Sequence, residues 1–497
     1  LPVNISIHAG GVLITEKSIY QYTATEKPPK GYPVSHFEMH NAEDAGIYKF
    51  DILSQRGLGH LKETVRLIEK NRNLKIDINR FSDFIRDSAI RALLRDGNTM
   101  GCFYVESPAM RMLLKKLQCE DYLTLVAASS IIRPGVARSG MMRAYIERFH
   151  LSRQGKTFPV IHPIIGTLLK ETYGVMVYQE DVIRVAHYFA GLTLAEADIL
   201  RRGMSGKFRS RKEFERIRTK FFENCRDKAY PEQIINRVWF EIESFSGYSF
   251  AKGHSASYAV ESYQSLYLKA HFPLEFMVGV INNFGGFYRT EFYFHEARLN
   301  GAQIEAPEIN QSDYLTSIHK NIIYTGFIHL KSLEHKIASM IPADRTINGN
   351  YTDIRNFIQR IPAGIEQLRI LIRAGAFRFT GKSKQELLWE ALICFNQQKN
   401  SATPGNLQLF EQENIEMNLP ELERNPIEDV FDEIELLGFP LHDPFRILDG
   451  PARTNHMASH LAKSKGKQIE IIGYLITTKH TRTSGNQSMY FGTFMDA

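Results

Sequence analysis

The amino-acid sequence predicts a large, multidomain protein that is mainly α-helical, with mixed α+β structure near its start and β-strands near its end. The chain has 497 residues, which exceeds one ordinary domain and favours about three or four. From about residue 80 to residue 300, apolar residues recur at three- and four-residue spacing, which is typical of packed helices. Near both ends, short stretches alternate apolar and polar residues, which is typical of strands.

The individual elements follow from these patterns, with Gly and Pro marking the breaks between them. We expect residues 300–395 to form smaller α-rich units. Residues 396–430 are polar, which is typical of a linker. Two strands near the C-terminus do not make a stable sheet alone, so we expect that domain to be incomplete in this chain. The predicted strands are 5–7, 10–14, 47–53, 468–476 and 489–492, and the predicted helices include 60–70, 108–117, 140–149, 179–190 and 257–269.

Composition narrows the class of protein. Hydrophobic residues make up 43% and charged residues 23%, as in ordinary globular proteins, and the net charge is +6. The four cysteines form no CxxC pair, which fits a reducing cytosol and gives a cytoplasmic location as the expectation. No apolar run approaches the roughly 20 residues that cross a bilayer, so no membrane partner is expected. Walker A, GxGxxG, GxSxG and HExxH patterns do not occur in the sequence.

The predicted strand at 47–53 carries a candidate metal and phosphate site. Side chains alternate along a strand, so Lys49 and Asp51 share one face while Phe50 and Ile52 take the other. A carboxylate beside an ammonium group, with apolar packing behind, suits a triphosphate bound with Mg²⁺. An ordinary half-buried strand with a charged face gives the same pattern, and the spacing leaves both interpretations open.

Two further stretches suit polyanions. Residues 201–230 contain eleven Lys and Arg against four Asp and Glu, a local charge of +7, and they begin with Arg201 and Arg202. A solvated helix face is the alternative interpretation of such a charge run. Residues 248–255 place aromatic residues beside Lys252 and His254 at a predicted helix start, which suits base stacking and phosphate contact. A histidine at a helix start is also a common capping residue.

Taken in order, these stretches resemble the C-family DNA polymerases, the alpha subunits of bacterial DNA polymerase III. The resemblance runs over roughly residues 5–280 and depends on an ordered set of short matches. These are residues 8–12, 49–53, 101–107, 133–135, 139–141, 173–175, 178–181, 196–204, 252–259, 262–264 and 267–271.

The resemblance implies an arrangement of five regions. They are the C-terminal part of an α+β polymerase palm (1–75), helical fingers (76–300), a helix-hairpin-helix and clamp-binding region (301–395), a linker with a clamp-binding peptide (396–455) and the truncated start of a β-barrel OB-fold (456–497).

The resemblance also implies an activity: DNA-directed transfer of dNTPs onto a primer 3′-OH, using two Mg²⁺ ions. Asp51 matches one catalytic, metal-binding aspartate of the palm, and Lys49 matches the basic residue near the triphosphate. The family's other two aspartates lie upstream of residue 8. We therefore expect the 497 residues alone to be inactive.

In the fingers, the resemblance implies nucleotide-binding roles for four residues. Arg201 and Arg202 match arginines expected to hold dNTP phosphates, and Lys252 and His254 match a motif near the nascent base pair. Ala251 and Gly253 stand where the family usually has Asn and Ser.

Expected partners are primer–template DNA, dNTPs, a sliding clamp and other replisome subunits. Residues 361–379 resemble part of the family's helix-hairpin-helix module, although hairpin glycines near residues 331–333 are not obvious. Two alternatives stay open: a non-catalytic DNA-binding or scaffold protein derived from the polymerase, and an error-prone translesion paralogue. The expected DNA contacts are Arg133, Lys207 and Arg209, and the expected clamp contacts are Gln408, Leu409 and Phe410.

Overall fold

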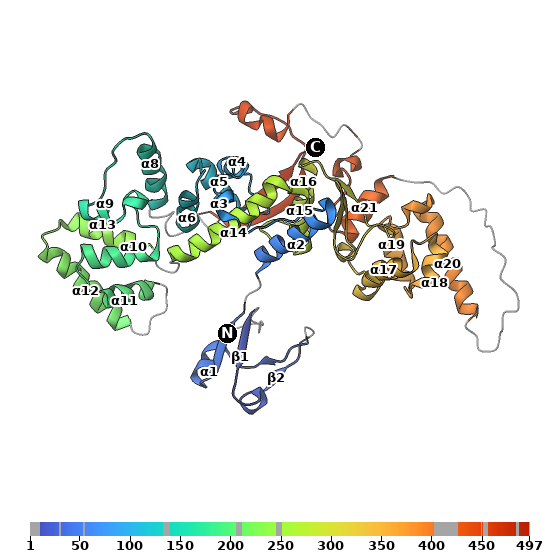
Figure 1. Ribbon diagram of the computed structural model, residues 1–497, viewed down its shortest axis with the longest axis horizontal. Coiled ribbons are helices and arrows are strands. Elements are labelled where there is room, and N and C mark those ends of the chain that lie inside the picture. Colours follow the sequence, from blue (N-terminus) through green and yellow to red (C-terminus); the bar gives the residue numbers. More distant parts are fainter. Residues whose placement is uncertain are drawn as a thin grey trace. The chain divides into compact units, whose positions relative to one another are not determined.

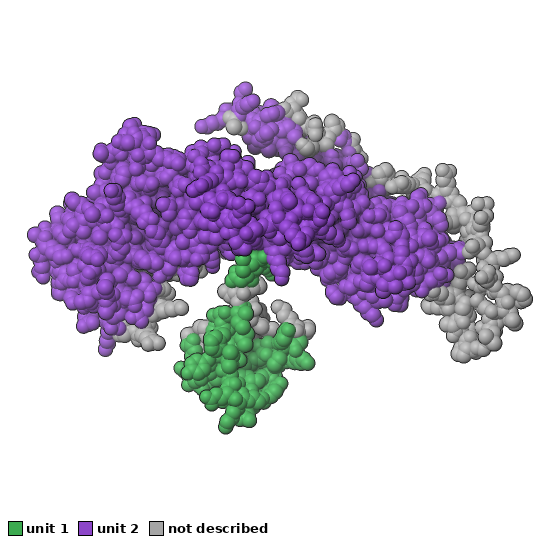
Figure 2. Space-filling model, in the orientation of Figure 1, with its two compact units in different colours: residues 1–59 green, residues 60–497 purple. Residues whose placement is uncertain are grey.

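The computed structural model is mainly helical, with small sheets near each end and in the middle of the chain. It divides into two compact units, Leu1–Gly59 and His60–Ala497, which are drawn in different colours in Figure 2. The predicted boundary at residue 75 stays a prediction, and the break between the units falls inside helix α2, Arg56–Arg72. The structure describes residues 10–28, 31–52, 55–132, 140–204, 211–244, 251–401, 426–448, 450, 456–483 and 487–496.

The first unit is built on a short antiparallel sheet. Strand β1, Gly11–Ile14, pairs with β4, Tyr48–Asp51, so that Val12 lies opposite Phe50. This confirms the strands predicted at 10–14 and 47–53, whereas the one predicted at 5–7 lies outside the described residues. The unit also contains β2 Thr25–Glu26, β3 Val34–Ser35 and helix α1 Met39–Asp44.

One face of the β1–β4 sheet is apolar and exposed. Residues that lie opposite each other in an antiparallel pair share a face, so Val12, Ile14, Tyr48 and Phe50 form one surface. Tyr48 is 74% exposed and Phe50 is 50% exposed. The apolar packing expected behind Asp51 is therefore not present among the described residues, since no second layer there covers this face.

The second unit is organised around helix α14, Lys252–His271, the long yellow-green helix near the middle of Figure 1. It packs against α3, α4, α6 and α15. Its buried residues Ala259, Tyr263 and Leu266 recur at three- and four-residue spacing, as predicted for a packed helix. The helices before and after it are α3 Phe81–Phe84, α4 Ser88–Asp96, α5 Pro108–Leu117, α6 Tyr122–Ile131, α8 Met141–Arg153, α9 Pro163–Leu168, α10 Gln179–Arg184 with a π-helical turn Val185–Phe189, α11 Leu194–Met204, α12 Arg211–Asp227, α13 Glu232–Glu243, α15 Pro273–Asn282 and α16 Thr290–Leu299.

Local sequence sets several helix ends. The Asp87 side chain accepts bonds from the first amides of α4, and that helix stops at Gly97 with a φ of 63°. Ser107 caps α5, and Pro108 occupies its first turn. The helix predicted at 108–117 is confirmed at both ends. In the described part of the chain, no helix has the length and apolar character needed to span a membrane.

A small mixed sheet begins the next region. Strand β7, Ile322–Tyr324, lies between β5, Gln303–Glu305, which is parallel to it, and β6, Ser317–His319, which is antiparallel. The sequence predicted only α-rich units here, because three-residue strands are too short to show an alternating pattern. The helices that follow are α17 His335–Asn348, α18 Ile354–Arg360, α19 Ile365–Arg373, α20 Lys384–Ser401 and α21 Pro426–Leu436.

The C-terminal strands are β8, Tyr474–Arg482, and β9, Ser488–Met495, which form an antiparallel pair. The strand predicted at 468–476 overlaps β8 only at residues 474–476, so its position was wrong. Register explains the difference, because β8 extends only where β9 lies opposite to accept its hydrogen bonds.

An ion pair to a buried carboxylate fixes α2 against α15. The Glu275 side chain is fully buried and accepts bonds from Arg72 Nε at 2.7 Å and Nη2 at 3.0 Å. Asn71 donates to the same carboxylate at 2.7 Å. The helices also approach closely: a Cβ added to Gly279 would lie 2.4 Å from Thr64 Oγ1.

Replacing Arg72 with Ala should lower the free energy of unfolding by about 3 kcal/mol, because Glu275 would keep a buried charge that has lost its partner. Urea unfolding measures this change. Arg66→Ala is the matched control, because Arg66 pairs with Glu63 on the exposed face of the same helix and should change stability by less than about 1 kcal/mol. Equal effects of the two variants would contradict the prediction.

Glu261 on α14 predicts a pH-dependent stability. Its Oε1 atom is buried without a hydrogen-bond partner in the described residues, and burial raises the pKa of this carboxyl to about 7. A carboxyl whose folded pKa is raised stabilises fully below its unfolded pKa and loses that contribution as the pH rises through 7. Glu261→Gln should therefore melt at a higher temperature than the parent chain at about pH 8 and equally at about pH 4.5. Glu69→Gln, at an exposed position of α2, is the control. Parallel pH profiles for Glu261→Gln and the parent would contradict the prediction.

Candidate functional site

A tight turn at the start of α10 organises the candidate site. The Asp181 carboxylate is 5% exposed and accepts bonds from the amides of Val177 at 2.9 Å and Tyr178 at 3.0 Å. Burial raises the pKa of Asp181 in spite of these two bonds. The turn therefore holds Tyr178, Gln179 and Glu180 in fixed positions at the helix start.

Helix α11 brings two arginines to this turn. Arg201 donates from Nη1 to Gln179 Oε1 at 3.1 Å and from Nε to Asp198 Oδ1 at 2.9 Å. Arg202 Nε lies 3.0 Å from the other oxygen of Asp198. Asp198 stands three and four residues before the arginines, so all three side chains meet on one helix face.

Helix α14 brings a third cation to the same turn. The Lys252 backbone amide donates to both carboxylate oxygens of Glu180 at 3.1 Å. Its Nζ lies 2.7 Å from both oxygens of Glu171 and 5.4 Å from the centre of the Tyr178 ring. Arg201 and Lys252, which are far apart in the sequence, therefore contact neighbouring residues of one turn.

The cluster has the chemistry of an anion site. Guanidinium and ammonium groups donate strong bonds to phosphate oxygens, and their carboxylate partners use the same donors. Arg202 is 54% exposed and Lys252 is 40% exposed, whereas Arg201 is 26% exposed. His254 is exposed on α14 two residues after Lys252, so it projects from a different side of the helix.

Several basic side chains of the stretch 201–230 form ion pairs or hydrogen bonds within the protein. Lys220 pairs with Glu196 at 2.7 Å, and this bond lowers the pKa of Glu196 to about 2. Arg226 pairs with Glu232, and Lys228 donates to the Phe189 carbonyl. The local charge of +7 therefore overstates the positive surface. The predicted DNA contacts Arg133, Lys207 and Arg209 lie outside the described residues, as do the predicted clamp contacts Gln408, Leu409 and Phe410.

Lys49 and Asp51 belong to the first unit. They share a face of β4, as the alternation predicted, and Lys49 Nζ lies 2.6 Å from Asp51 Oδ1. Asp51 is 51% exposed, and a carboxylate oxygen is the ligand type that Mg²⁺ prefers. Across the described residues, His, Cys, Asp and Glu form no group of three or more that could hold a metal ion. Asp51 is therefore the one carboxylate that strand β4 offers to a metal ion.

Residues 331–334, which precede α17, form a hairpin turn that contains no glycine. Ser332 has a φ of 64°, a left-handed conformation that glycine adopts most easily. Two amides of this hairpin donate within the chain: Lys331 to the Leu436 carbonyl at 2.8 Å, and Glu334 to Gln367 Oε1 at 2.7 Å. Helix α21 thereby closes on the hairpin.

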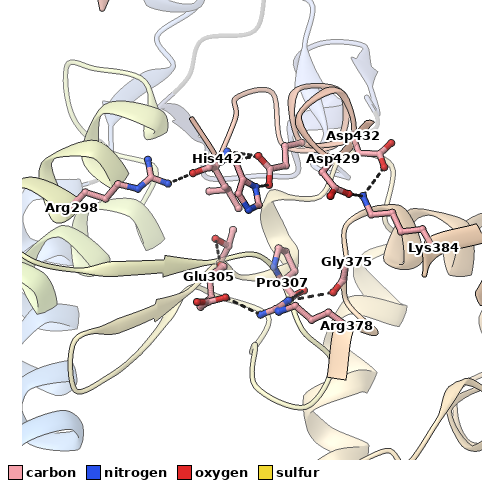
Figure 3. Close-up of polar contacts among 12 residues, drawn as sticks. Arg298, Glu305, Pro307, Gly375, Arg378, Lys384, Asp429, Asp432 and His442 are labelled. Atoms are coloured by element: carbon pink, nitrogen blue, oxygen red, sulfur yellow. Dashed lines mark hydrogen bonds and ion pairs between the residues drawn. The ribbon is translucent and has the colours of Figure 1, made fainter. Parts of the chain in front are cut away.

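Ion pairs hold the acidic helix α21 in that place. Figure 3 shows Lys384 of α20 between Asp429 and Asp432, at 2.7 and 2.8 Å. Arg373 of α19 pairs with Asp432 at 2.8 Å and also with Glu435.

Three known domain families match consecutive parts of this chain. Residues 57–229 match the bacterial DNA polymerase III alpha subunit finger domain, and residues 301–387 match a helix-hairpin-helix motif. Residues 1–54 match the bacterial DNA polymerase III alpha NTPase domain. The chain belongs to the bacterial DNA polymerase III alpha subunit family.

Individual members of the DNA polymerase III alpha subunit family extend the match across most of the chain. The DNA polymerase III subunit alpha of Aquifex aeolicus (strain VF5) is 32% identical over 416 residues, which cover 83% of this chain and 35% of that protein. The corresponding subunit of Staphylococcus aureus (strain COL) is 33% identical over 392 residues, covering 78% of this chain and 36% of that protein. The matched residues span about a third of the length of each relative.

The sequence patterns assigned no role to the residues that contact Arg201 and Lys252. Gln179, Glu180 and Asp181 form part of a family-like stretch, yet nothing in their spacing reveals that α11 and α14 meet at them. Glu171 carries no sequence signal, because its contact with Lys252 depends on tertiary packing.

Asp181→Ala should loosen the turn and lower the free energy of unfolding by about 1–3 kcal/mol, because two buried amides lose their acceptor. Urea unfolding followed by circular dichroism measures the change. Lys170→Ala, at an exposed position nearby, is the control and should leave the midpoint unchanged. A midpoint equal to that of the control would show that Asp181 does not hold the turn.

Proposed function

We propose that this chain forms part of a DNA-directed DNA polymerase and that its fingers region, residues 76–300, binds the phosphates of incoming dNTPs through Arg201, Arg202 and Lys252. The observation that carries the proposal is that Arg201 and the Lys252 amide contact neighbouring residues at the start of α10, while Asp198 holds Arg202 beside Arg201. The match of residues 57–229 to the finger domain supports the same assignment. His254, two residues after Lys252 on α14, is proposed as a further nucleotide contact.

In the first unit, Asp51 would supply one carboxylate ligand to Mg²⁺, and Lys49 is the proposed phosphate contact. Bound Mg²⁺ would neutralise the charge that develops on the transferred phosphoryl group. One carboxylate does not hold two metal ions, and the family order places the other palm aspartates upstream of residue 8.

The remaining regions bind DNA and partner proteins. Residues 301–395 carry the helix-hairpin-helix function, and residues 456–497 begin an OB-fold whose exposed aromatic side chains Tyr490, Phe491 and Phe494 suit base stacking. Residues 408–410 bind the sliding clamp. Arg133, Lys207 and Arg209 contact the DNA backbone. Four buried, free cysteines support a cytoplasmic location.

The test uses a polymerase polypeptide that includes these 497 residues together with the family's upstream aspartates. Asp51→Asn should reduce primer extension by at least about 10³-fold, because the change removes a metal ligand that acts in the transition state. Binding of primer–template, measured by fluorescence anisotropy, should stay within about twofold of the parent. Asp44→Asn on α1 is the control. Near-normal extension by Asp51→Asn would remove Asp51 from the metal site.

A further inference from the structure

Arg201 is held from two different helices. Asp198 binds its Nε edge, but Asp198 lies on α11 with Arg201 and moves with it. Gln179 binds Nη1 at 3.1 Å from the first position of α10. The Gln179 contact therefore fixes the guanidinium relative to the turn that also receives Lys252.

The chemistry of Gln179 suits this task. Its side-chain oxygen accepts a bond from the guanidinium without adding negative charge to the site. A carboxylate at the same place would orient Arg201 equally well and would also repel a bound phosphate. A long arginine side chain that is already held loses less conformational freedom when it binds a ligand.

We propose that Gln179 is a positioning residue that orients Arg201 for a triphosphate. This inference rests on the proposed function, because it assumes that Arg201 contacts the anion. Gln179 acts through Arg201, and the turn held by Asp181 carries that restraint to the rest of the site.

A double-mutant cycle tests the proposal on the 497-residue chain, with inorganic triphosphate as the probe and isothermal titration calorimetry as the readout. Gln179→Met keeps the length of the side chain and removes the acceptor, so affinity should fall about fivefold to tenfold. Arg201→Ala should also weaken binding. Combined with Arg201→Ala, Gln179→Met should cause no further loss, because the group that it orients is gone. Gln233→Met, at an exposed position of α13, is the matched control.

Each outcome has a distinct meaning. Unchanged affinity in Arg201→Ala would overturn the proposed phosphate role of Arg201 and, with it, the present inference. A loss in Arg201→Ala with no loss in Gln179→Met would overturn the positioning role alone. Equal losses from Gln179→Met in both backgrounds would show that Gln179 supports the fold and does not orient Arg201. Melting temperatures of all variants identify any variant that fails to fold, and Gln179→Ser then replaces Gln179→Met in the cycle.

Discussion

The buried carboxylate of Asp181 is the constraint on which the candidate site depends. Its bonds to two successive backbone amides set the direction in which the chain enters α10. That direction decides where Gln179 and Glu180 point, and these two residues receive Arg201 of α11 and the first amide of α14. Three helices that are separate in the sequence therefore take their relative positions from one turn.

The cations of the site already have partners in this structure. Asp198 holds both arginines, and Glu171 holds the ammonium group of Lys252. On the proposed function, an incoming polyanion would have to exchange with carboxylates as well as with water. Such an exchange would lower affinity for weakly charged anions more than for a triphosphate, whose several oxygens bind several cations together. The carboxylates would then contribute selectivity, and Gln179 would orient Arg201 without this cost.

The sequence predicted the features that depend on residues close together in the chain. The helix at 108–117 was correct at both ends: Ser107 and Pro108 begin it, and Gln118, with a φ of 46°, ends it. The shared face of Lys49 and Asp51 follows from strand alternation alone. Contacts between segments that are distant in the sequence were not predicted. The partners of Lys252 and Lys220 and the β5–β7–β6 sheet all depend on tertiary packing, and no spacing rule encodes them. The position of β8 was missed for the same reason, because its extent depends on β9.

The ion pairs of Arg373 and Lys384 have a consequence for how this module responds to salt. They fasten α21 to α19 and α20 through side chains that remain partly exposed. Because dissolved ions screen such charges, raising the ionic strength weakens the attachment of α21 before it weakens the buried apolar core.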